Sequence, residues 1–469
     1  MGRCATGGTR SWPARGSRKK GLQKAFKAEI IAEIKTLIGK QTAEQIDFEA
    51  LETAIRRSAL QLAARLIEQW INSDVSDFTG PSLSCICGAS AQYAGRRSKQ
   101  IESVLGQLNL SRAYYYCTAC KRGFFPRDSL LGLESTSLSP AVTRMVGLVG
   151  AMVSFQEGGE LLKELAGVEV ETKHVERTAE ALGREIDKYE RSCVESTNEN
   201  EIPPTLYMGI DGTGVPMRSS ELEGRPGKQS DGSAKTREVK LVTVWSAESR
   251  DSNGLPMRDE GSVTYSAAIE SAATRDTDKH PSEFAQRVAR EATRRAFQQA
   301  SRKVALGDGA PWIWNIFGEL FPDAIQIVDR FHAKQHLSEV AKVIWGPESH
   351  FAKEWAQQRH AELDSGELDT LLAALAIHAP YYEDVRRCVD YIQCNRHRMR
   401  YADFHNEQIC TSTGVVEAGC KVAIGTRLKR AGMHWTVRGS NAIIALRCCK
   451  LSGRFEDFWE SRSQGTLET

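Results

Sequence analysis

Apolar residues recur at helical spacing in the N-terminal part of the chain and form short strand-like runs further on. Between residues 22 and 70 they return every three or four positions, which predicts a long helix or a pair of helices. Three further helical patterns follow between residues 138 and 186. After residue 201 short runs rich in Val, Ile, Leu and Tyr predict strands. The pattern therefore indicates a helical region followed by an α/β region.

The predicted strands and helices follow one another in a specific order. Three strands are expected at residues 206–215, 238–245 and 263–269, followed by a helix at 281–299. Residues 303–337 then predict a strand (304–307), a helix entered through Pro311, a strand (324–328) and a helix beginning near His332. This is the element order of the ribonuclease-H-like fold, in which the first and fourth strands lie side by side and each carries an aspartate.

Aspartates stand at both of those strands. Asp211 lies in the middle of a strongly apolar strand, where burying a carboxylate without a partner is costly. Asp308 and Asp329 each follow a strand directly, at the edge where open α/β sheets bind ligands. The structural alternatives are that Asp308 begins a turn with Gly309 and that Asp329 is a helix N-cap.

A third acid is expected from a late helix. A helix opening near Gly414 and running to about Arg430 places Glu417 and Lys421 one turn apart on a common side. Glu417 is therefore the candidate third carboxylate, and a surface ion pair with Lys421 is the alternative. Residues 333–410 are rich in Ala, Leu, His and Arg at helical spacing and are expected to form an all-helical insertion ahead of this helix.

Four of the twelve cysteines form two close pairs, Cys85 with Cys87 and Cys117 with Cys120. Four thiolates arranged in this way can bind structural Zn²⁺ tetrahedrally, and the segment between the pairs predicts a hairpin, so residues 81–128 are expected to be a zinc-ribbon-like unit. The C-x-C spacing of the first pair departs from the commoner C-x-x-C. Four core cysteines without metal are the alternative.

Charge and helical pattern indicate DNA as a partner. The second and third helices of the 138–186 region are joined by a short turn at Gly167, as in a helix-turn-helix, and Lys173 and Arg177 lie at the start of the second. An ordinary helical hairpin gives the same pattern. Net charge is +2, but basic residues cluster near both ends of the chain, which suits phosphate backbones. These clusters are Arg10, Arg15, Arg18, Lys19, Lys20, Lys24 and Lys27, and Lys421, Arg427, Lys429, Arg430 and Arg438. A disordered arm and a solvated helix face are the alternatives.

The location of the protein follows from what its sequence lacks. No apolar run reaches the ~18 residues of a membrane span, and no apolar segment follows the basic N-terminus as in a secretory signal. An intracellular protein is therefore expected, and its cysteines are expected to be thiols or metal ligands rather than disulfides.

Several motifs together resemble the DDE transposases of bacterial insertion sequences, in particular the ISKra family of the Mutator-like superfamily. The resemblance covers roughly residues 50–455. The motifs are Asp211-Gly-Thr-Gly, Leu306-Gly-Asp-Gly-Ala, Asp329-Arg-Phe-His332, Asn395-Arg-His-Arg-Met-Arg-Tyr401 and Gly414-Val-Val-Glu417 followed by Arg427-Leu-Lys-Arg430.

The resemblance implies a site, a mechanism and partners. Asp211, Asp308 and Glu417 would be the catalytic triad, with Asp329 and His332 as an accessory pair. Three neighbouring carboxylates repel one another, and two Mg²⁺ ions, for which Mn²⁺ can substitute, would neutralise them and promote phosphodiester cleavage and strand transfer. The partners would be double-stranded transposon ends and target DNA, bound by a homodimer or larger assembly in the bacterial cytoplasm, at the nucleoid.

The domains expected on this basis follow one another along the chain. They are a basic arm and helical region (1–80), the zinc-ribbon-like unit (81–128), a helix-turn-helix-like DNA-binding region (129–200), the first part of the ribonuclease-H-like core (201–332), the insertion (333–410) and the last helix of the core with C-terminal helices (411–469).

Two other functions are consistent with parts of the sequence. Gly209-Ile-Asp-Gly-Thr-Gly214 also resembles the phosphate loop of sugar kinases and actin-like ATPases, which would make the protein an ATP phosphotransferase. A second Gly-rich phosphate loop, which that class requires, is not evident. A DNA-binding regulator derived from a transposase, without catalytic activity, is the third possibility, and the acids at all three positions argue against it.

Overall fold

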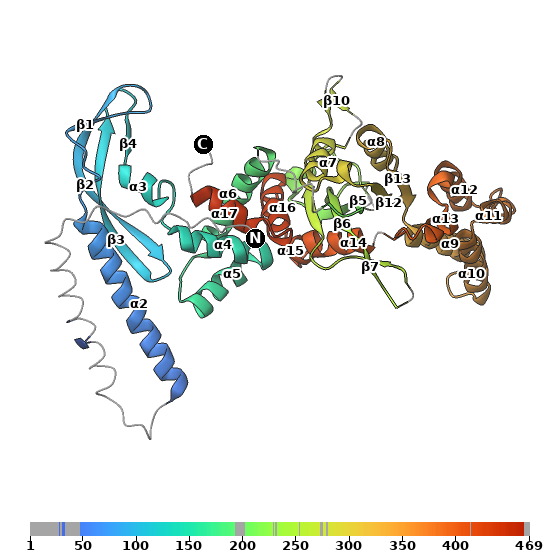
Figure 1. Cartoon of the computed structure of the whole chain (residues 1–469), viewed down its shortest axis with the longest axis horizontal. Helices are drawn as coiled ribbons and strands as arrows, with labels where there is room; N and C mark the ends of the chain where they lie inside the picture. The colour runs from blue at the N-terminus through green and yellow to red at the C-terminus, as the bar shows by residue number, and fades with distance from the viewer. Residues whose placement is uncertain are drawn as a thin grey trace. The chain divides into compact units, whose positions relative to one another are not determined.

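The computed structural model describes residues 47–192, 202–227, 229, 232–252, 254–272, 275–277, 280–412 and 414–463, together with residues 28, 31 and 32. The chain divides into two compact units (Figure 1). The first contains residues 1–145 and 159–171, and the second contains residues 146–158 and 172–469. The predicted basic arm, Arg10 to Lys27, lies outside the described residues.

The first unit consists of a long helix against an antiparallel sheet. Helix α2 (Phe48–Ser73) is capped by Asp47, whose Oδ1 accepts the N–H of Ala50 at 3.4 Å. The sheet has the order β1 (Ser82–Ser84), β2 (Ser90–Ser103), β3 (Gly106–Cys117) and β4 (Arg122–Phe124). Strands β2 and β3 form the hairpin predicted between the cysteine pairs.

Apolar side chains from the helix and the hairpin form the core of this unit. Ala64 of α2 is buried with Ile101, Leu108 and Leu110 of the hairpin and with Leu133, which follows the short helix α3 (Pro126–Leu131). The apolar residues at helical spacing in α2 thus include some that pack against the hairpin. Most of α2 is nevertheless exposed.

The second unit is built on a five-stranded mixed sheet with the order β13-β12-β5-β6-β9. The strands are β5 (Thr205–Pro216), β6 (Thr236–Ser246), β9 (Thr264–Ala268), β12 (Arg302–Gly307) and β13 (Ile325–Val328). Strands β5, β6 and β9 pair antiparallel, whereas β12 is parallel to β5 and β13 is parallel to β12. All five predicted strands are present, and the mixed α/β architecture is confirmed.

Helices cover both faces of this sheet. Helices α7 (Glu283–Arg294) and α8 (Pro311–Leu320) lie on one side in Figure 1, and α14 (Gly414–Gly419) lies on the other. The contacts agree, because a Cβ on Gly307 would point at Ile313 of α8, whereas a Cβ on Gly209 would point at Val416 of α14. After α14 the chain continues through a π-helical turn (Cys420–Gly425) into α15 (Thr426–Leu428). The predicted helix to Arg430 therefore contains a wider turn in its middle.

Residues 330–406 form five α-helices, in the region where the sequence predicted helical structure over 333–410. They are α9 (Arg330–Trp345), α10 (His350–Ser365), α11 (Leu368–Ala376), α12 (Glu383–Asn395) and α13 (Tyr401–Asn406). Buried residues of this segment, such as Leu337 and Ile392, belong to the same apolar core as the strand residues Leu206 and Leu306. The segment is thus packed as part of the second unit.

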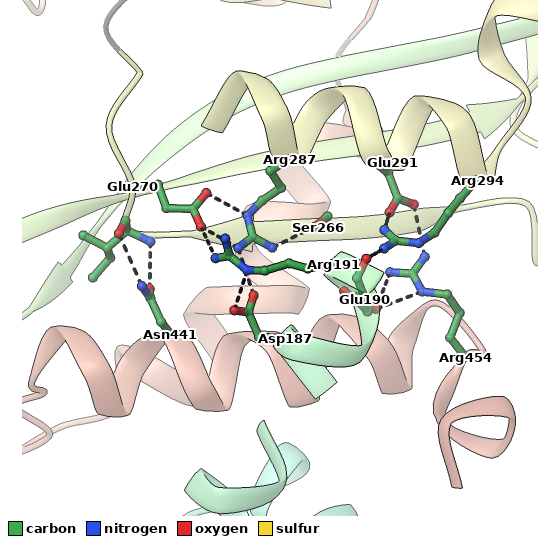
Figure 2. Close-up of polar contacts among 11 residues, drawn as sticks. Asp187, Glu190, Arg191, Ser266, Glu270, Arg287, Glu291, Arg294, Asn441 and Arg454 are labelled. Carbon is green, nitrogen blue, oxygen red and sulfur yellow. Dashed lines mark hydrogen bonds and ion pairs between the residues drawn. The ribbon is translucent and has the colours of Figure 1, made fainter. Parts of the chain in front are cut away.

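The start and the end of the second unit are joined by helix packing and buried charges. Helix α6 (Thr172–Ser192) packs against α16 (Val437–Leu451), and α17 (Phe455–Ser463) follows. Figure 2 shows the charged network between these elements and α7. Arg287 binds Glu270 at 2.6 Å and Asp187 at 3.1 Å. Arg454 binds Glu190 at 3.0 Å and the fully buried Glu291 at 3.1 Å.

The remaining elements are short or join the larger ones. Helices α4 (Pro140–Met152) and α5 (Phe155–Leu161) are followed by a π-helical turn, Leu162–Ala166, and complete the three predicted helices with α6. Two small hairpins pair β7 (Ser249–Arg250) with β8 (Pro256–Met257) and β10 (Arg275–Thr277) with β11 (His280–Pro281). Within the described ranges, no helix is both long and apolar enough to span a membrane.

Candidate functional site

The strand register brings three aspartates to one edge of the sheet. Gly209 of β5 is the partner of Leu306 in β12, so Asp211 and Asp308, two residues further along each parallel strand, come at the same level. Gly307 is likewise the partner of Val328, and the N–H of Asp329 donates to the Gly307 carbonyl at 2.8 Å. Because neighbouring strands are ~4.8 Å apart, Asp211, Asp308 and Asp329 lie in one row.

Asp211 is a half-buried carboxylate with no cationic partner in direct contact among the described residues. Its Oδ1 accepts the N–H of Gly212 at 2.7 Å, and its Oδ2 accepts the thiol of Cys420 at 3.3 Å. Burial raises the pKa of Asp211, and the nearby charge of Asp308 raises it further, although the two hydrogen bonds and His332 oppose this. Burial without a contacting cation therefore disfavours the ionised form of this carboxylate.

Asp308 lies in a turn, as its Asp-Gly sequence allows. Its Oδ1 accepts the N–H of Ala310 at 2.8 Å, and Gly309 has a φ of +103°, which disfavours side chains. The main-chain carbonyl of Asp308 accepts the hydroxyl of Tyr391 at 2.9 Å. Both the side chain and the backbone of this acid are thus fixed by hydrogen bonds.

Asp329 acts as the N-cap of α9. Its Oδ1 accepts the N–H of His332 at 2.6 Å, and the residue is 4% exposed. His332 lies close enough to Asp211 to lower its pKa, and its ring centroid is 5.5 Å from that of His336. Asp329 and His332 therefore lie beside Asp308 and Asp211, with Asp329 engaged in helix capping.

Glu417 approaches the same edge but is turned to solvent. Helix α14 lies close over β5, because a Cβ on Gly209 would come within 2.0 Å of Val416 Cγ2. Glu417 itself has a side chain that is 67% exposed, and it binds Lys421 Nζ at 2.9 Å. The helix thus packs on β5, while Glu417 forms the surface pair with Lys421. The stretch Gly209–Gly214 runs as a strand paired with β6 rather than as a loop.

The four cysteines of the first unit converge. Cys85 Sγ is 3.6 Å from Cys120 Sγ, and Cys87 Sγ is 3.7 Å from Cys117 Sγ. All four sulfur atoms lie within 4.8 Å of one another, and they are the single group of three or more His, Cys, Asp or Glu side chains at that spacing among the described residues. Zn–S bonds of about 2.3 Å put tetrahedral sulfurs ~3.8 Å apart, so the cluster can bind a metal such as zinc.

The local backbone favours the thiolate of Cys117, whereas burial and the neighbouring thiols raise the pKa of Cys120 to about 12. The N–H of Cys120 lowers the pKa of Cys117 to about 7. Gly88, with φ +82°, makes the turn after the first pair, where its N–H donates to the Cys85 carbonyl at 2.9 Å. The departure from C-x-x-C spacing therefore does not prevent the sulfurs from converging.

The predicted DNA-binding residues lie in different surroundings. Lys173 is exposed and pairs with Glu176 at 2.9 Å, and Arg177 is exposed on the same helix. Lys421 pairs with Glu417. Lys429 is exposed and donates to the Thr213 hydroxyl, two residues after Asp211 on β5. Lys429 therefore brings a positive charge to the edge of the sheet that carries Asp211, Asp308 and Asp329, hereafter the aspartate edge.

The two remaining arginines, Arg427 and Arg430, make defined contacts within the second unit. Arg430 binds Glu157, with Nη2 2.8 Å from Oε1, and this hydrogen bond lowers the pKa of Glu157 to about 2. Arg427 is fully buried, donates to the Gly150 carbonyl at 3.0 Å and lies over the rings of Phe155 and Trp435. Burial lowers its pKa to about 10. Arg427 is therefore a packing residue, not one that offers its charge at the surface.

Three residues at the site were not singled out from the sequence. Cys420 stands at a buried position after α14, and its thiol donates to Asp211. His336 stands one helical turn after His332, and this spacing was a usable signal that both rings share a face. Tyr391 comes from the helical insertion, and nothing in the local sequence indicates that it reaches Asp308.

Comparison with known proteins gives a family match and a weak structural similarity. No curated protein matches the chain. The Drosophila P element transposase strand transfer complex contains a chain that matches with a TM-score of 0.25 and 11% identity, over 72% of this chain and 84% of that one. The family described as "Uncharacterised protein family (UPF0236)" matches residues 90–462. The chain therefore belongs to the UPF0236 family.

Proposed function

We propose that this protein is a DDE-type DNA transposase, similar to the ISKra family, that cuts transposon ends and joins them to target DNA. The observation that carries the proposal is the register of β5 and β12, which puts Asp211 and Asp308 at the same level of adjacent parallel strands. Helix α14, with Glu417, packs over the first of these strands.

The topology of the sheet supports a ribonuclease-H-like core. In the order β13-β12-β5-β6-β9, the first three strands in sequence are antiparallel neighbours, and the fourth and fifth are added in parallel on the other side of β5. The aspartates then stand on the first and fourth strands, as the resemblance to DDE transposases implies.

The chemistry of the donor atoms supports Mg²⁺ as the ion of this proposal. Asp211 and Asp308 offer hard carboxylate oxygens, and no cationic side chain contacts Asp211 directly among the described residues. Bound Mg²⁺ would activate the attacking oxygen and stabilise the leaving oxygen at a phosphodiester. Glu417 completes this set only when its ion pair with Lys421 breaks. An exposed i, i+4 pair contributes only about 0.5 kcal/mol, so breaking it costs little free energy.

Residues of this chain would then hold and orient the DNA. Lys429 and His332 stand beside Asp211, where they can attract the phosphate. Lys173, Arg177, Lys421 and Arg430 are proposed to contact the DNA backbone, and buried Arg427 is left out of this surface. Zn²⁺ at Cys85, Cys87, Cys117 and Cys120 would fix the end of the β2–β3 hairpin.

The test is strand cleavage by variants that keep the size of each acid but remove its charge. Asp211→Asn, Asp308→Asn and Glu417→Gln should each lower the rate of cleavage of DNA carrying the terminal repeats by at least about 100-fold, with DNA binding retained. Double variants should be scarcely worse than single ones, because the acids act as a unit.

Two controls sharpen this experiment. Glu383→Gln removes an exposed acid on α12 and should cleave at the wild-type rate. Asp329→Asn keeps a residue that caps helices well, so a rate defect in this folded variant would indicate the accessory catalytic role. Cleavage at the wild-type rate by Asp308→Asn would show that the proposed acids are the wrong ones.

A further inference from the structure

The backbone of Asp308 needs a partner from outside the sheet. Strand β12 ends at Gly307, whose carbonyl accepts the N–H of Asp329. The carbonyl of Asp308 is the next one along the chain, beyond the β12–β13 ladder. A partly buried carbonyl without a partner is unfavourable, and the Tyr391 hydroxyl supplies this partner at 2.9 Å.

Tyr391 also fills the space beside the turn. Gly309 has a φ of +103°, and a Cβ placed there would lie 2.4 Å from Cε2 of the Tyr391 ring. The ring thus packs directly on the turn that carries Asp308. Any shift of Tyr391 changes both a hydrogen bond and a packing contact of this turn.

A histidine of helix α9 packs against the ring of the tyrosine. The ring centroid of Tyr391 is 4.6 Å from that of His336 on α9, and His336 in turn contacts His332. Because a carbonyl oxygen can only accept a hydrogen bond, the phenol is the donor in its contact with Asp308.

We propose that Tyr391, from helix α12 of the insertion, is a positioning residue that fixes the backbone of Asp308 and so sets the direction of its carboxylate. The inference rests on the proposed function for its consequence in catalysis, but the positioning itself is a property of the folded chain. The side chain of Asp308 is held by the Ala310 amide, so loosening the turn also loosens that hydrogen bond.

The experiment compares Tyr391→Phe with wild type by hydrogen–deuterium exchange, without DNA or added metal. The substitution keeps the ring and removes only the hydroxyl. Exchange at residues 308–310 should become about fivefold faster, which is the effect of losing one hydrogen bond. Tyr381→Phe is the matched control, because Tyr381 precedes the same helix and is 78% exposed, and it should leave these amides unchanged. Unchanged exchange at 308–310 in Tyr391→Phe would overturn the proposal.

Cleavage kinetics provide the second readout. Tyr391→Phe should lower kcat by about tenfold at unchanged KM for DNA, and it should raise the Mg²⁺ concentration that gives half-maximal rate. A raised KM with unchanged kcat would contradict positioning. Because the exchange measurement needs no activity, it decides the role of Tyr391 even where the wild-type protein cuts no DNA, a result that would count only against the proposed function.

Discussion

At the residue scale, four cysteine side chains of the first unit form the candidate metal site. The sulfurs of Cys85, Cys87, Cys117 and Cys120 converge from two turns that are far apart in sequence. Because thiolates packed so closely repel one another, a shared divalent cation is the most effective way to stabilise them.

Removing one of these ligands should remove the metal. Cys117→Ser should lower bound zinc from about one ion per chain to near zero and lower the thermal midpoint by at least about 2 °C, since metal binding stabilises the folded state. Elemental analysis and thermal unfolding measure the two effects. Cys394→Ser is the control, because Cys394 is an exposed thiol outside the cluster. Absence of zinc from the wild-type protein would contradict the assignment.

Some residues of the aspartate edge could be identified from the sequence, and others could not. Asp211 and Asp308 could be identified because each stands on or after an apolar strand, and parallel pairing then makes them neighbours. The thiol of Cys420 could not, because an apolar helix position does not reveal what it faces. Glu417 has two competing partners, and sequence alone does not decide between Lys421 and a metal.

At the scale of elements, the buried charges in Figure 2 join four parts of the second unit: α6, α7, the end of β9 and the turn after α16. Burial alone would raise the pKa of Glu291, but Arg454 and Arg294 outweigh it and lower the pKa. Such a network is strongly destabilised when a single partner is removed, because the remaining charge stays buried.

Glu291→Gln should therefore lower the free energy of unfolding by about 3 kcal/mol at pH 7. A carboxylate whose pKa is lower in the folded state contributes stability above its unfolded pKa of about 4.3 and loses it as pH falls below that value. The difference in free energy of unfolding between wild type and variant should thus shrink below about pH 4. Denaturant titrations at several pH values measure this. Glu383→Gln breaks an exposed pair with Arg387 and should change stability by less than about 0.5 kcal/mol.

Element order was predictable from the sequence, whereas element detail was not. Continuous apolar runs and glycine breaks suffice to predict β5, β12 and β13, because these strands are largely buried. The π-helical turn at Cys420–Gly425 has no such signal. The contacts of this turn and of α15 are equally invisible in the sequence, since Cys420 donates to Asp211 and buried Arg427 donates to the Gly150 carbonyl.

At the scale of the whole molecule, the net charge of +2 conceals local clusters of positive charge. Lys173 and Arg177 lie on the first turns of α6 and are exposed. Each phosphate contact releases counterions, so affinity for DNA should fall steeply with salt.

Neutralising both residues tests this surface. The double variant Lys173→Ala and Arg177→Ala should reduce the slope of log affinity against log salt by about 2, without changing the fold. Arg387→Ala, on an exposed pair of the insertion, should leave the slope unchanged. Fluorescence anisotropy over a range of salt concentrations measures both, and an identical slope in the double variant would rule out these contacts.

The packing of α6 against α16 has a consequence for synthesis of the protein. The chain must reach α16 before α6 and β9 are covered, since Asn441 closes the edge of β9 by accepting the Ile269 N–H at 2.8 Å and Arg462 binds Glu185 at 2.7 Å. At about 5–20 residues per second, the ribosome needs on the order of ten seconds or more to pass from β5 to α17. For most of that time Asp211 has been made, but Cys420 and Lys429, which contact its strand, have not. The aspartate edge is therefore assembled only as the last part of the chain emerges, and nascent chains that stop before α16 are expected to expose apolar surface and be degraded.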